Sequence, residues 1–364
     1  MAKIKIILSG INMVNGGLLT IYQNCLSQLL LFIDEKDIEV IALVADKTKF
    51  DEPNISFIEF PKSKKNWLYR LYYEYYYFKK ISIREKPSIW FSLHDATPNV
   101  ISEKQFVYCH NPNMFYKPTL KDWKLEYKVA LFYYLYKFVY QKNINKNKAV
   151  FVQQHWIKKN FETIFKINNV VVTTPNYVSE KKNDIISLDN SKINFFFPTL
   201  SRVFKNVEII GEAVKLLPSI IKNRIKIYVT IGKNDNKYSS FIIKKYNLEQ
   251  IDFIGNQSKQ TIFGYYESID CLIFPSKLET WGLPITEAKA YIKPMLLANL
   301  PYAKETVGNY DAVSFFDVDN PQELANLITA FVEKTIVYQG NKYAFSDEEQ
   351  LNNWTELFDF MLQS

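Results

Sequence analysis

Short apolar runs alternate with longer amphipathic segments along the first half of the chain. The runs are rich in β-branched and aromatic residues, as expected of buried strands, and the segments between them show helical spacing. The predicted strands are Lys3–Leu8, Glu39–Val44, Ser88–Leu93, Gln105–Cys109 and Lys148–Val152. The predicted helices lie near Leu18–Phe32, Trp67–Ile83, Asp122–Gln141 and His155–Phe165. This alternation is typical of a parallel sheet with crossover helices.

The alternation stops near Thr174 and resumes near Lys192, after a polar stretch that indicates a linker. The next predicted strands are Lys192–Phe197, Arg224–Thr230, Gln250–Ile254, Ile269–Phe274 and Met295–Ala298. The next predicted helices are Asn206–Leu216, Lys259–Glu267, Pro284–Tyr291, Pro321–Glu333 and Asp347–Met361. We therefore expect an α/β protein with two Rossmann-like domains, residues 1–175 and 176–346, whose parallel sheets face each other across a cleft. A terminal helix, about residues 347–364, is expected to pack back on the first domain.

Glycine is scarce in this chain, and aromatic residues are abundant. Only 10 of the 364 residues are glycine, whereas 16% are aromatic; average glycine usage is roughly 7%. The hydrophobic content of 48% and the charged content of 23% are those of a globular protein, so disorder and collagen-like repeats are excluded. With so few glycines, each is expected where the backbone requires one.

The cysteine pattern and the hydropathy indicate a reducing compartment. Cys25, Cys109 and Cys271 are widely spaced and lie in apolar stretches, which predicts buried thiols and neither disulfides nor a zinc site. No apolar stretch reaches about 18 residues, and the apolar run at the N-terminus is too short for a signal peptide. We therefore expect a cytoplasmic protein.

The net charge of +7 is unevenly distributed. Residues 1–180 carry 25 Lys and Arg against 16 Asp and Glu, whereas residues 181–364 carry 20 against 22. The first half is therefore expected to meet an anionic partner, for which nucleic acid, a membrane surface and a phosphorylated substrate are the candidates.

The segment Pro275–Ala288 has the pattern of a phosphate-binding turn. A buried strand ends before it, a turn with Glu279 and Gly282 follows, and a helix starts at Pro284, a residue favoured in the first helical turn. The free backbone N–H groups at that helix start form an anion site. Because bare carboxylates repel phosphate, Glu279 and Glu287 are better assigned to hydroxyl groups on either side of it, as in a nucleotide-sugar. The alternative is an ordinary capped helix with solvated glutamates.

Arg202 and Lys205 lie between a predicted strand and a predicted helix, at the edge of the same expected cleft. Two cations at this spacing suit a diphosphate, because arginine offers a fork of donors and lysine a point charge. The alternative is a solvated basic loop.

These motifs together resemble a known family. The run from Ser276 to Ala288, with Glu279 and Glu287 separated by seven residues, is similar to the signature of the family 4 retaining glycosyltransferases of the GT-B fold. The similarity extends to Asn299–Gly308 and to Arg202–Asn206. It is strong over about residues 192–335 and weaker over the N-terminal half.

The resemblance implies that residues 1–175 bind the acceptor and residues 176–346 bind a nucleotide-diphosphate sugar donor, which is a co-substrate, without a metal ion or another cofactor. It implies that Glu279 holds hydroxyls of the donor sugar and Glu287 those of the ribose. The amides that it places against the sugar and diphosphate are those of Trp281, Gly282 and Leu283.

The resemblance also implies the roles of the basic residues. Arg202 and Lys205 would neutralise the departing diphosphate, and His110 matches a histidine that lies close to the donor sugar in the family. The acceptor hydroxyl would arrive on the same face as the leaving group, and a phosphate oxygen would take its proton. No covalent carboxylate intermediate is then needed.

Several glycines mark further candidate contacts. Gly16 and Gly17 lie between the first strand and its helix, where the backbone can approach a phosphate or a sugar, although paired glycines also form ordinary turns. Their spacing is not Gly-x-Gly-x-x-Gly, so a nicotinamide site is not supported. Selection of the nucleotide base is expected to depend on the loops near Gly232 and Gly255.

The remaining candidates are weaker. His94 and Asp95 end a predicted strand and are candidate acceptor contacts, whereas His155 is expected at the surface or at a helix cap. Asp317-Val318-Asp319 matches the Asp-x-Asp metal motif of the other large glycosyltransferase fold, but its position before Asn320-Pro321 is better explained by a helix start.

Two stretches combine aromatic and basic residues. Residues 62–86 contain eight basic, two acidic and eight aromatic residues, and residues 121–148 contain eight aromatic residues and seven lysines. Such helices suit the surface of an anionic membrane or a lipid-linked acceptor. RNA stacking is a rival use, and packing in the core accounts for part of the aromatic residues.

The sequence therefore predicts a retaining, hexosyl-type glycosyltransferase that moves a sugar from a nucleotide-diphosphate donor to a glycan acceptor. A lipid-linked acceptor in bacterial surface-polysaccharide synthesis (O-antigen or capsule), at the inner face of the cytoplasmic membrane, would explain the basic aromatic half. One rival prediction is a phosphorylase or nucleotide-sugar epimerase on the same fold. Another is a non-catalytic protein that binds nucleotide-sugar or RNA.

Overall fold

The computed structural model describes residues 4–14, 16–35, 37–174, 186–343 and 350–364, and it divides the chain into two compact units. The first unit comprises Met1–Asn111, Leu135–Tyr177 and Asp347–Ser364, and the second comprises Pro112–Tyr134 and Val178–Ser346. The expected domain boundary at 175/176 lies outside the described residues. The segment Pro112–Tyr134 groups with the second unit, which differs from the expected domain 1–175, because its side chains bond to the loop and helix that follow the first strand of that unit.

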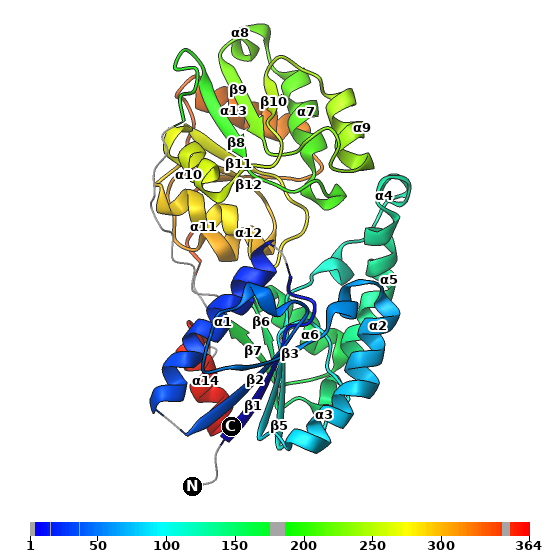
Figure 1. The fold of residues 1–364 in the computed structure, drawn as a ribbon. Helices are drawn as coiled ribbons and strands as arrows, with labels where there is room; N and C mark the ends of the chain where they lie inside the picture. Colours follow the sequence, from blue (N-terminus) through cyan, green and yellow to red (C-terminus); the bar gives the residue numbers. More distant parts are fainter. Residues whose placement is uncertain (1–3, 15, 36, 175–185, 344–349) are drawn as a thin grey trace. The chain divides into compact units, whose positions relative to one another are not determined.

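The described part of the first unit contains an eight-stranded sheet in which all neighbouring strands are parallel (Figure 1). Its order is β14-β7-β6-β5-β4-β1-β2-β3. The strands are β1 (Ile4–Ser9), β2 (Ile38–Val44), β3 (Ser56–Glu59), β4 (Ile89–Ser92), β5 (Lys104–Cys109), β6 (Ala149–Val152), β7 (Val170–Thr173) and β14 (Gln350–Leu351). The order reverses between β1 and β4, so the carboxyl ends of these strands form the switch point at which open α/β sheets bind ligands.

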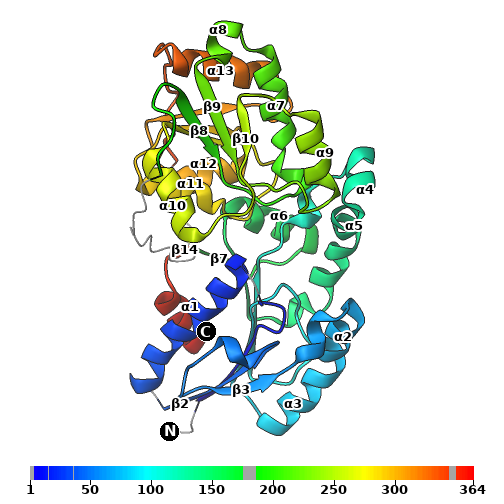
Figure 2. The same ribbon diagram turned by 45° about the horizontal axis from the view of Figure 1, so that its top comes forward.

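Helices cover both faces of this sheet (Figure 2). On one face, α1 and α14 pack together over Ile6 and Leu8 of β1, and on the other Phe78 of α3 packs with Ile7. Side chains along a strand alternate between faces, so this buried strand is apolar at every position from Ile6 to Leu8. The helices are α1 (Gly16–Glu35), α2 (Trp67–Tyr72), α3 (Phe78–Glu85), α6 (His155–Phe165), α14 (Trp354–Gln363) and α5 (Tyr127–Gln141), which runs from the second unit into the first.

Gly10, directly after β1, is required by close packing. The Tyr22 hydroxyl donates to the carbonyl oxygens of Leu8 and Leu43 at 3.1 and 3.3 Å. A Cβ at Gly10 would lie 2.7 Å from the Tyr22 ring. Any larger residue would therefore displace a buried ring that connects two strands.

The described part of the second unit contains a six-stranded parallel sheet with the order β10-β9-β8-β11-β12-β13. The strands are β8 (Ile193–Phe197), β9 (Ile225–Val229), β10 (Ile251–Phe253), β11 (Cys271–Phe274), β12 (Met295–Ala298) and β13 (Val313–Phe316). The helices are α4 (Leu120–Leu125), α7 (Val207–Leu216), α8 (Ser219–Lys222), α9 (Lys237–Lys245), α10 (Lys259–Ser268), α11 (Leu283–Ala290), α12 (Pro301–Val307) and α13 (Pro321–Val332). This is the dinucleotide-fold strand order, and its switch point lies between β8 and β11.

Two predicted helices differ in detail from the structure. The helix expected over Trp67–Ile83 contains a π-helical turn, Tyr73–Tyr77, between α2 and α3. The helix expected over Asp122–Gln141 breaks at Glu126, whose extended φ of −142° separates α4 from α5. Neither break contains proline or glycine, so tertiary contacts override local helix propensity there.

Several short elements were not predicted. The sequence-based assignment lacks strands β3, β7 and β13 and helices α8, α9 and α12. All of these except α9 are too short to show a periodicity of their own. The terminal helix begins at Trp354. Gln350 and Leu351, expected in that helix, instead form strand β14, which pairs with β7. Residues 347–349 lie outside the described residues. The three cysteines are buried and free, which confirms that prediction. Among the described helices, none is both long and apolar enough to cross a membrane.

Candidate functional site

The site of the second unit is built on the loops that follow β8 and β11. These strands are neighbours, with Phe196 opposite Leu272, so both loops leave the same edge of the sheet. The backbone N–H of Lys277, after β11, donates to the Phe204 carbonyl oxygen, after β8, at 2.7 Å. The topology therefore brings together two loops that are about 70 residues apart in the sequence.

Lys205 and Glu279, one from each loop, form an ion pair. The Lys205 ammonium lies 2.5 Å from a carboxylate oxygen of Glu279, and each side chain is 14% exposed. The Lys205 ammonium nitrogen lies 5.7 Å from the centroid of the Phe204 ring and 5.9 Å from that of the Phe274 ring. The sequence analysis assigned these residues to diphosphate and sugar separately. The structure places them in direct contact, so both face one small region.

Gly282 sets the start of α11. Its φ of 87° lies in the left-handed region, which glycine adopts without strain, and its carbonyl oxygen accepts from the Ile285 N–H at 2.9 Å. Pro284 occupies the first helical turn, as expected. The preceding Trp281 is fixed through its indole N–H, which donates to Thr286 at 2.9 Å, and through its carbonyl oxygen, which accepts from the Thr306 hydroxyl. Leu283 is the first residue of the helix.

Glu287, one turn into α11, is held from the neighbouring helix α10. The Tyr266 hydroxyl donates to a Glu287 carboxylate oxygen at 2.8 Å. Tyr266 is itself fully buried. The carboxylate is thereby restrained from one side, one turn from the start of α11.

A pocket of about 270 Å³ opens at the carboxyl ends of β8, β9 and β10. Lys205 and Pro284 are the residues of the predicted site that line it. The other lining residues are Pro198, Thr199, Leu200, Thr230, Asn256, Gln257 and Ile262. Hydroxyl and amide groups beside a lysine are suited to hydroxyls, a base edge or a phosphate.

Sequence reasoning missed the polar residues of this pocket, although a signal was present. Thr199, Thr230 and Asn256 each follow or end a predicted strand, where parallel sheets place ligand contacts. Thr230 accepts from the Thr199 N–H at 2.6 Å and donates to the Thr199 carbonyl oxygen at 2.7 Å. These two hydrogen bonds hold the carboxyl ends of β8 and β9 together.

Gly232 lies in the loop after β9, beside this pocket but outside its lining. Its N–H donates to Asp235 at 2.8 Å, and a Cβ at Gly232 would lie 2.8 Å from the same carboxylate. Asp235 also accepts from the Ser201 hydroxyl at 2.8 Å. A Cβ here would therefore require the Asp235 side chain to shift, and the predicted contact of this loop with a nucleotide base stays a prediction.

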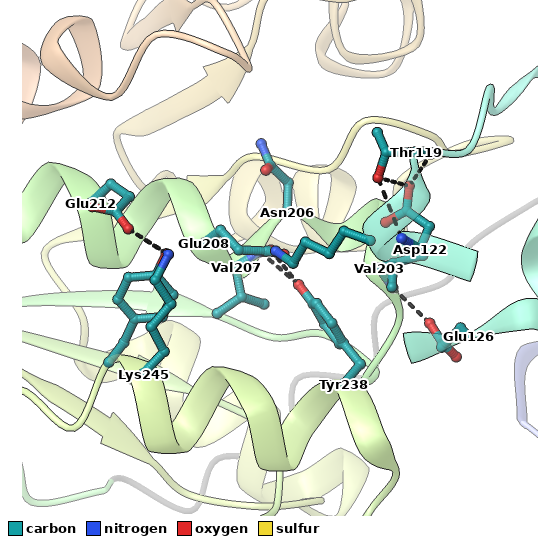
Figure 3. Close-up of polar contacts among 12 residues, drawn as sticks. Thr119, Asp122, Glu126, Val203, Asn206, Val207, Glu208, Glu212, Tyr238 and Lys245 are labelled. Atoms are coloured by element: carbon teal, nitrogen blue, oxygen red, sulfur yellow. Dashed lines mark hydrogen bonds and ion pairs between the residues drawn. The ribbon is translucent and has the colours of Figure 1, made fainter. Parts of the chain in front are cut away.

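Arg202 contacts a residue that the sequence analysis did not single out. Its guanidinium donates to a Glu126 carboxylate oxygen at 2.8 Å. The other oxygen accepts from the Val203 N–H at 2.7 Å (Figure 3). The Arg202 side chain is 52% exposed, whereas that of Glu126 is 7% exposed. No sequence signal marks Glu126, because it lies inside a stretch with continuous helical character.

The first unit holds the other predicted contacts. Gly16 and Gly17 begin α1, and the preceding loop is anchored by the Lys49 ammonium, which donates to the Val14 carbonyl oxygen at 2.7 Å. His110 follows β5, with its ring 4.1 Å from that of Tyr108. These residues belong to the first unit, so their expected contact with a donor stays a prediction.

His94 and Asp95, candidate acceptor contacts, are buried in internal networks of the first unit. Ser9 bonds to His94 Nε2 at 2.9 Å, and Glu74 lies 3.1 Å from His94 Nδ1. Arg70, 2.7 Å from Glu74, also donates to the His94 carbonyl oxygen. His94 is therefore engaged on both ring nitrogens.

Asp95 holds the loop after β4 to the loop after β5. It adopts a φ of 73° and accepts from the N–H groups of His110 and Asn111 at 2.6 and 3.0 Å. The hydroxyls of Tyr136 and Tyr140 also donate to it, at 2.8 and 3.1 Å. Its carboxylate therefore positions His110, the residue that directly follows β5.

Burial lowers the pKa of His110 to about 4, and the nearby Asp95 carboxylate opposes that shift only in part. An imidazole with a lower pKa in the folded chain binds fewer protons than in the unfolded chain, whose value is about 6.5. Stability should therefore fall as pH drops from about 6.5 to about 4, by about 3 kcal/mol in total, and level off below. The free energy of unfolding is measured with urea across this pH range for the wild type and for His110→Phe. The difference, wild type minus variant, should decrease as the pH falls. Identical pH profiles for the two proteins would contradict this prediction.

The Asp-x-Asp sequence immediately precedes the start of α13, as the sequence indicated. Asp317 accepts from the Asp319 N–H at 2.9 Å, and Asp319 pairs with Lys277 at 2.5 Å. Asn320 then caps α13 through the Glu323 N–H. Across the described residues, no group of three or more His, Cys, Asp or Glu side chains is arranged to hold a metal ion.

The comparisons with known proteins agree with this architecture. Residues 177–344 match the model of the family described as glycosyl transferases group 1, which covers most of the second unit. A comparison with curated protein sequences gives no significant match. Residues 177–344 of the second unit are therefore similar to the domain that this family model describes.

Solved structures extend the likeness to both units. Sucrose-phosphate synthase from Thermosynechococcus elongatus matches with a TM-score of 0.66 and 12% identity over 91% of this chain and 90% of that one. WaaG, a glycosyltransferase involved in lipopolysaccharide biosynthesis, gives 0.64 and 12% over 91% and 94%. HepE from Anabaena, in complex with UDP-glucose, gives 0.56 and 13% over 91% and 90%. The GT-B fold expected from the sequence is confirmed.

Proposed function

We propose that this chain is a retaining glycosyltransferase of family 4 that transfers a hexosyl group from a nucleotide-diphosphate sugar to a glycan acceptor. The observation that carries the proposal is the Lys205–Glu279 pair at the switch point of the second sheet, beside the start of α11 and a polar pocket. A cation for phosphate, a carboxylate for hydroxyls and a nearby helix N-terminus are what such a donor requires. HepE, which shares the fold, is in complex with UDP-glucose, in keeping with a donor of this class.

The proposed chemistry needs no metal ion. The bond between the sugar C1 and the diphosphate oxygen breaks, and the acceptor oxygen bonds to C1 on the same face. The acceptor proton passes to the departing phosphate oxygen, so atoms and charges balance. Arg202 and Lys205 would stabilise the charge that develops on the diphosphate, which is the electrostatic contribution that preorganised donors make best.

Donor binding can be tested directly on the full chain. A thermal-shift panel of UDP, GDP, dTDP and ADP sugars should give one series with a clear rise in melting temperature, because a ligand that binds only the folded state stabilises it. Glu279→Gln should abolish the advantage of the sugar nucleotide over the free nucleotide. A flat panel, or an unchanged preference in the variant, would contradict the proposed donor site.

For the acceptor, we propose a lipid-linked glycan of bacterial surface polysaccharide, reached at the cytoplasmic face of the membrane. The support is a surface of the first unit over α2, the π turn, α3 and the end of α5. Leu68 is 75% and Phe138 66% exposed there. A hollow of about 460 Å³ between these helices is lined by Leu71, Tyr72, Tyr75, Phe138, Val139 and Lys142. The aliphatic side chains among these residues, Leu68, Leu71 and Val139, favour lipid over RNA, which stacks on aromatic rings.

The charges on this surface favour an anionic bilayer. Glu74 is fully buried against Arg70, and Glu85 pairs with Lys5 and Arg84. Residues 135–148 contain no acidic residue. The charged side chains exposed on these segments are cations, among them Lys62, Lys79, Lys80, Lys137 and Lys142. Lysines beside exposed aromatic and aliphatic groups match an interface with acidic headgroups. WaaG, which acts in lipopolysaccharide biosynthesis, supports an acceptor of this class.

Vesicle binding tests this surface. The chain should float with vesicles containing the anionic lipid phosphatidylglycerol and much less with phosphatidylcholine alone. The assay is run at low salt, because salt screens exposed charges. Leu68→Ser with Phe138→Ser should weaken binding by about 10-fold or more, since each buried side chain contributes about 1.5–3 kcal/mol. Leu216→Ser with Ile220→Ser, at exposed positions of the second unit, is the matched control. Equal flotation of both double variants would overturn the assignment.

A further inference from the structure

The segment Pro112–Tyr134 is anchored to the first loop and helix of the second unit (Figure 3). Lys121 forms an ion pair with Glu208 at the start of α7. The ring of Tyr116 meets that of Phe204 edge-on at 5.9 Å. Glu126 bonds to Arg202 and Val203. Three contacts of different chemistry therefore fix the segment against the residues that precede and begin α7.

Glu126 differs from the other two anchors in what it touches. Its two carboxylate oxygens bind consecutive residues of one loop, the Arg202 guanidinium at 2.8 Å and the Val203 N–H at 2.7 Å. It therefore restrains a side chain and the backbone beside it together. Because Glu126 breaks the helix between α4 and α5, its own backbone is held by the ends of two helices.

The contact leaves most of the arginine available. Only one terminal nitrogen of Arg202 bonds to Glu126, and the side chain is 52% exposed. A guanidinium has five N–H donors in a planar fork, so a diphosphate can bind at the edges that Glu126 does not occupy. The Glu126 side chain, by contrast, is only 7% exposed. The cost of removing its charge from water is offset only while its hydrogen-bond donors stay in place.

We propose that Glu126 is a positioning residue that presets Arg202 for the departing diphosphate. It rests on the proposed function, since it assigns Glu126 a task only if Arg202 meets that group. An arginine held before substrate arrives loses less side-chain freedom on binding, and its charge is already placed where negative charge develops. The residue acts through Arg202 and does not itself touch the substrate.

The test compares kinetics of the full chain with donor and acceptor. Glu126→Gln keeps the shape but offers one oxygen to two donors, so one of the two contacts is lost. We expect kcat to fall by about 10-fold, in line with the cost of a misplaced group, and KM for the donor to change by less than about 3-fold. Lys121→Ala removes a neighbouring anchor of the same segment and should leave kcat within about 2-fold.

A double-mutant cycle separates positioning from a merely structural role. In an Arg202→Ala background, Glu126→Gln should have less than about a 2-fold further effect on kcat, since nothing remains to position. In the same background Glu126→Gln should raise the melting temperature, because it neutralises a buried carboxylate that has lost its cation, whereas in the wild type it should lower it.

The outcomes distinguish this inference from the proposed function. If Arg202→Ala reduces kcat but Glu126→Gln does not, or if the two effects multiply, the positioning role is wrong and the proposed transferase stands. If Lys121→Ala reduces kcat as much as Glu126→Gln, docking of the segment and not Glu126 is responsible, which also overturns it. If Arg202→Ala itself leaves kcat unchanged, the error lies in the proposed diphosphate site.

Discussion

Replacing Lys205 by alanine should lower kcat by about 10²- to 10³-fold, because a preorganised donor to a developing negative charge contributes on that scale. Lys205 is 14% exposed and lies between two aromatic rings, so its charge acts in a region of reduced solvent screening. The ion pair with Glu279 adds a second effect. Removing the ammonium leaves a carboxylate that no longer has its cation and that would repel the donor phosphate.

Matched variants separate charge from packing at this position. Lys205→Met retains the apolar stem against Phe204 and Phe274 and should lose as much activity as Lys205→Ala. Lys205→Arg restores the charge and should recover part of it. Lys215→Ala removes an exposed lysine from α7 and should be neutral within about 2-fold. If Lys205→Met were as active as the wild type in steady-state assays, the lysine would have no electrostatic role.

The second large effect is expected at Glu287, as a loss of nucleotide affinity. A carboxylate that accepts from ribose hydroxyls makes charge-assisted hydrogen bonds of about 1.5–3 kcal/mol. Glu287→Gln should therefore raise the dissociation constant of the preferred nucleoside diphosphate by about 10- to 100-fold. Tyr266→Phe removes only the hydroxyl that restrains Glu287, and it should weaken binding by a smaller factor of about 2–5.

Calorimetry with ribose-modified ligands makes this prediction specific. The wild type should prefer the natural nucleoside diphosphate over its 2′,3′-dideoxy counterpart, and Glu287→Gln should bind the two almost equally. Loss of affinity for both ligands with the preference intact would mean that Glu287 supports α11 and does not contact the ribose.

Most of the buried strands of both sheets could be predicted, whereas the short strands β3, β7 and β13 could not. Buried strands such as β8 and β11 are continuous apolar runs, so their positions and their order of appearance could be predicted. The turn around Gly282 was also predictable, because glycine and proline mark it locally. The break at Glu126 has no such mark. It depends on contacts with Val203 and Arg202, which are about 76 residues away along the chain.

The candidate site was predictable by residue type but not by pairing. Periodicity places Lys205 and Glu279 at the ends of two strands, yet only the strand order shows that those strands are neighbours. Likewise, His94 had the position of a ligand contact, but Ser9 and Glu74 use both of its ring nitrogens. The local sequence pattern does not show which distant residue will contact a buried polar side chain. Such contacts decide whether that side chain is available to bind a ligand.

Product analysis tests the central claim most directly. The chain is incubated with the nucleotide-sugar that it binds and with lipid-linked acceptors, and the products are separated by liquid chromatography and mass spectrometry. We predict free nucleoside diphosphate in equal amount to an acceptor enlarged by one sugar of unchanged anomeric configuration, and both products formed about 10²- to 10³-fold more slowly with Lys205→Ala. A sugar phosphate, an isomerised nucleotide-sugar, or tight donor binding without turnover on any acceptor would contradict the assignment.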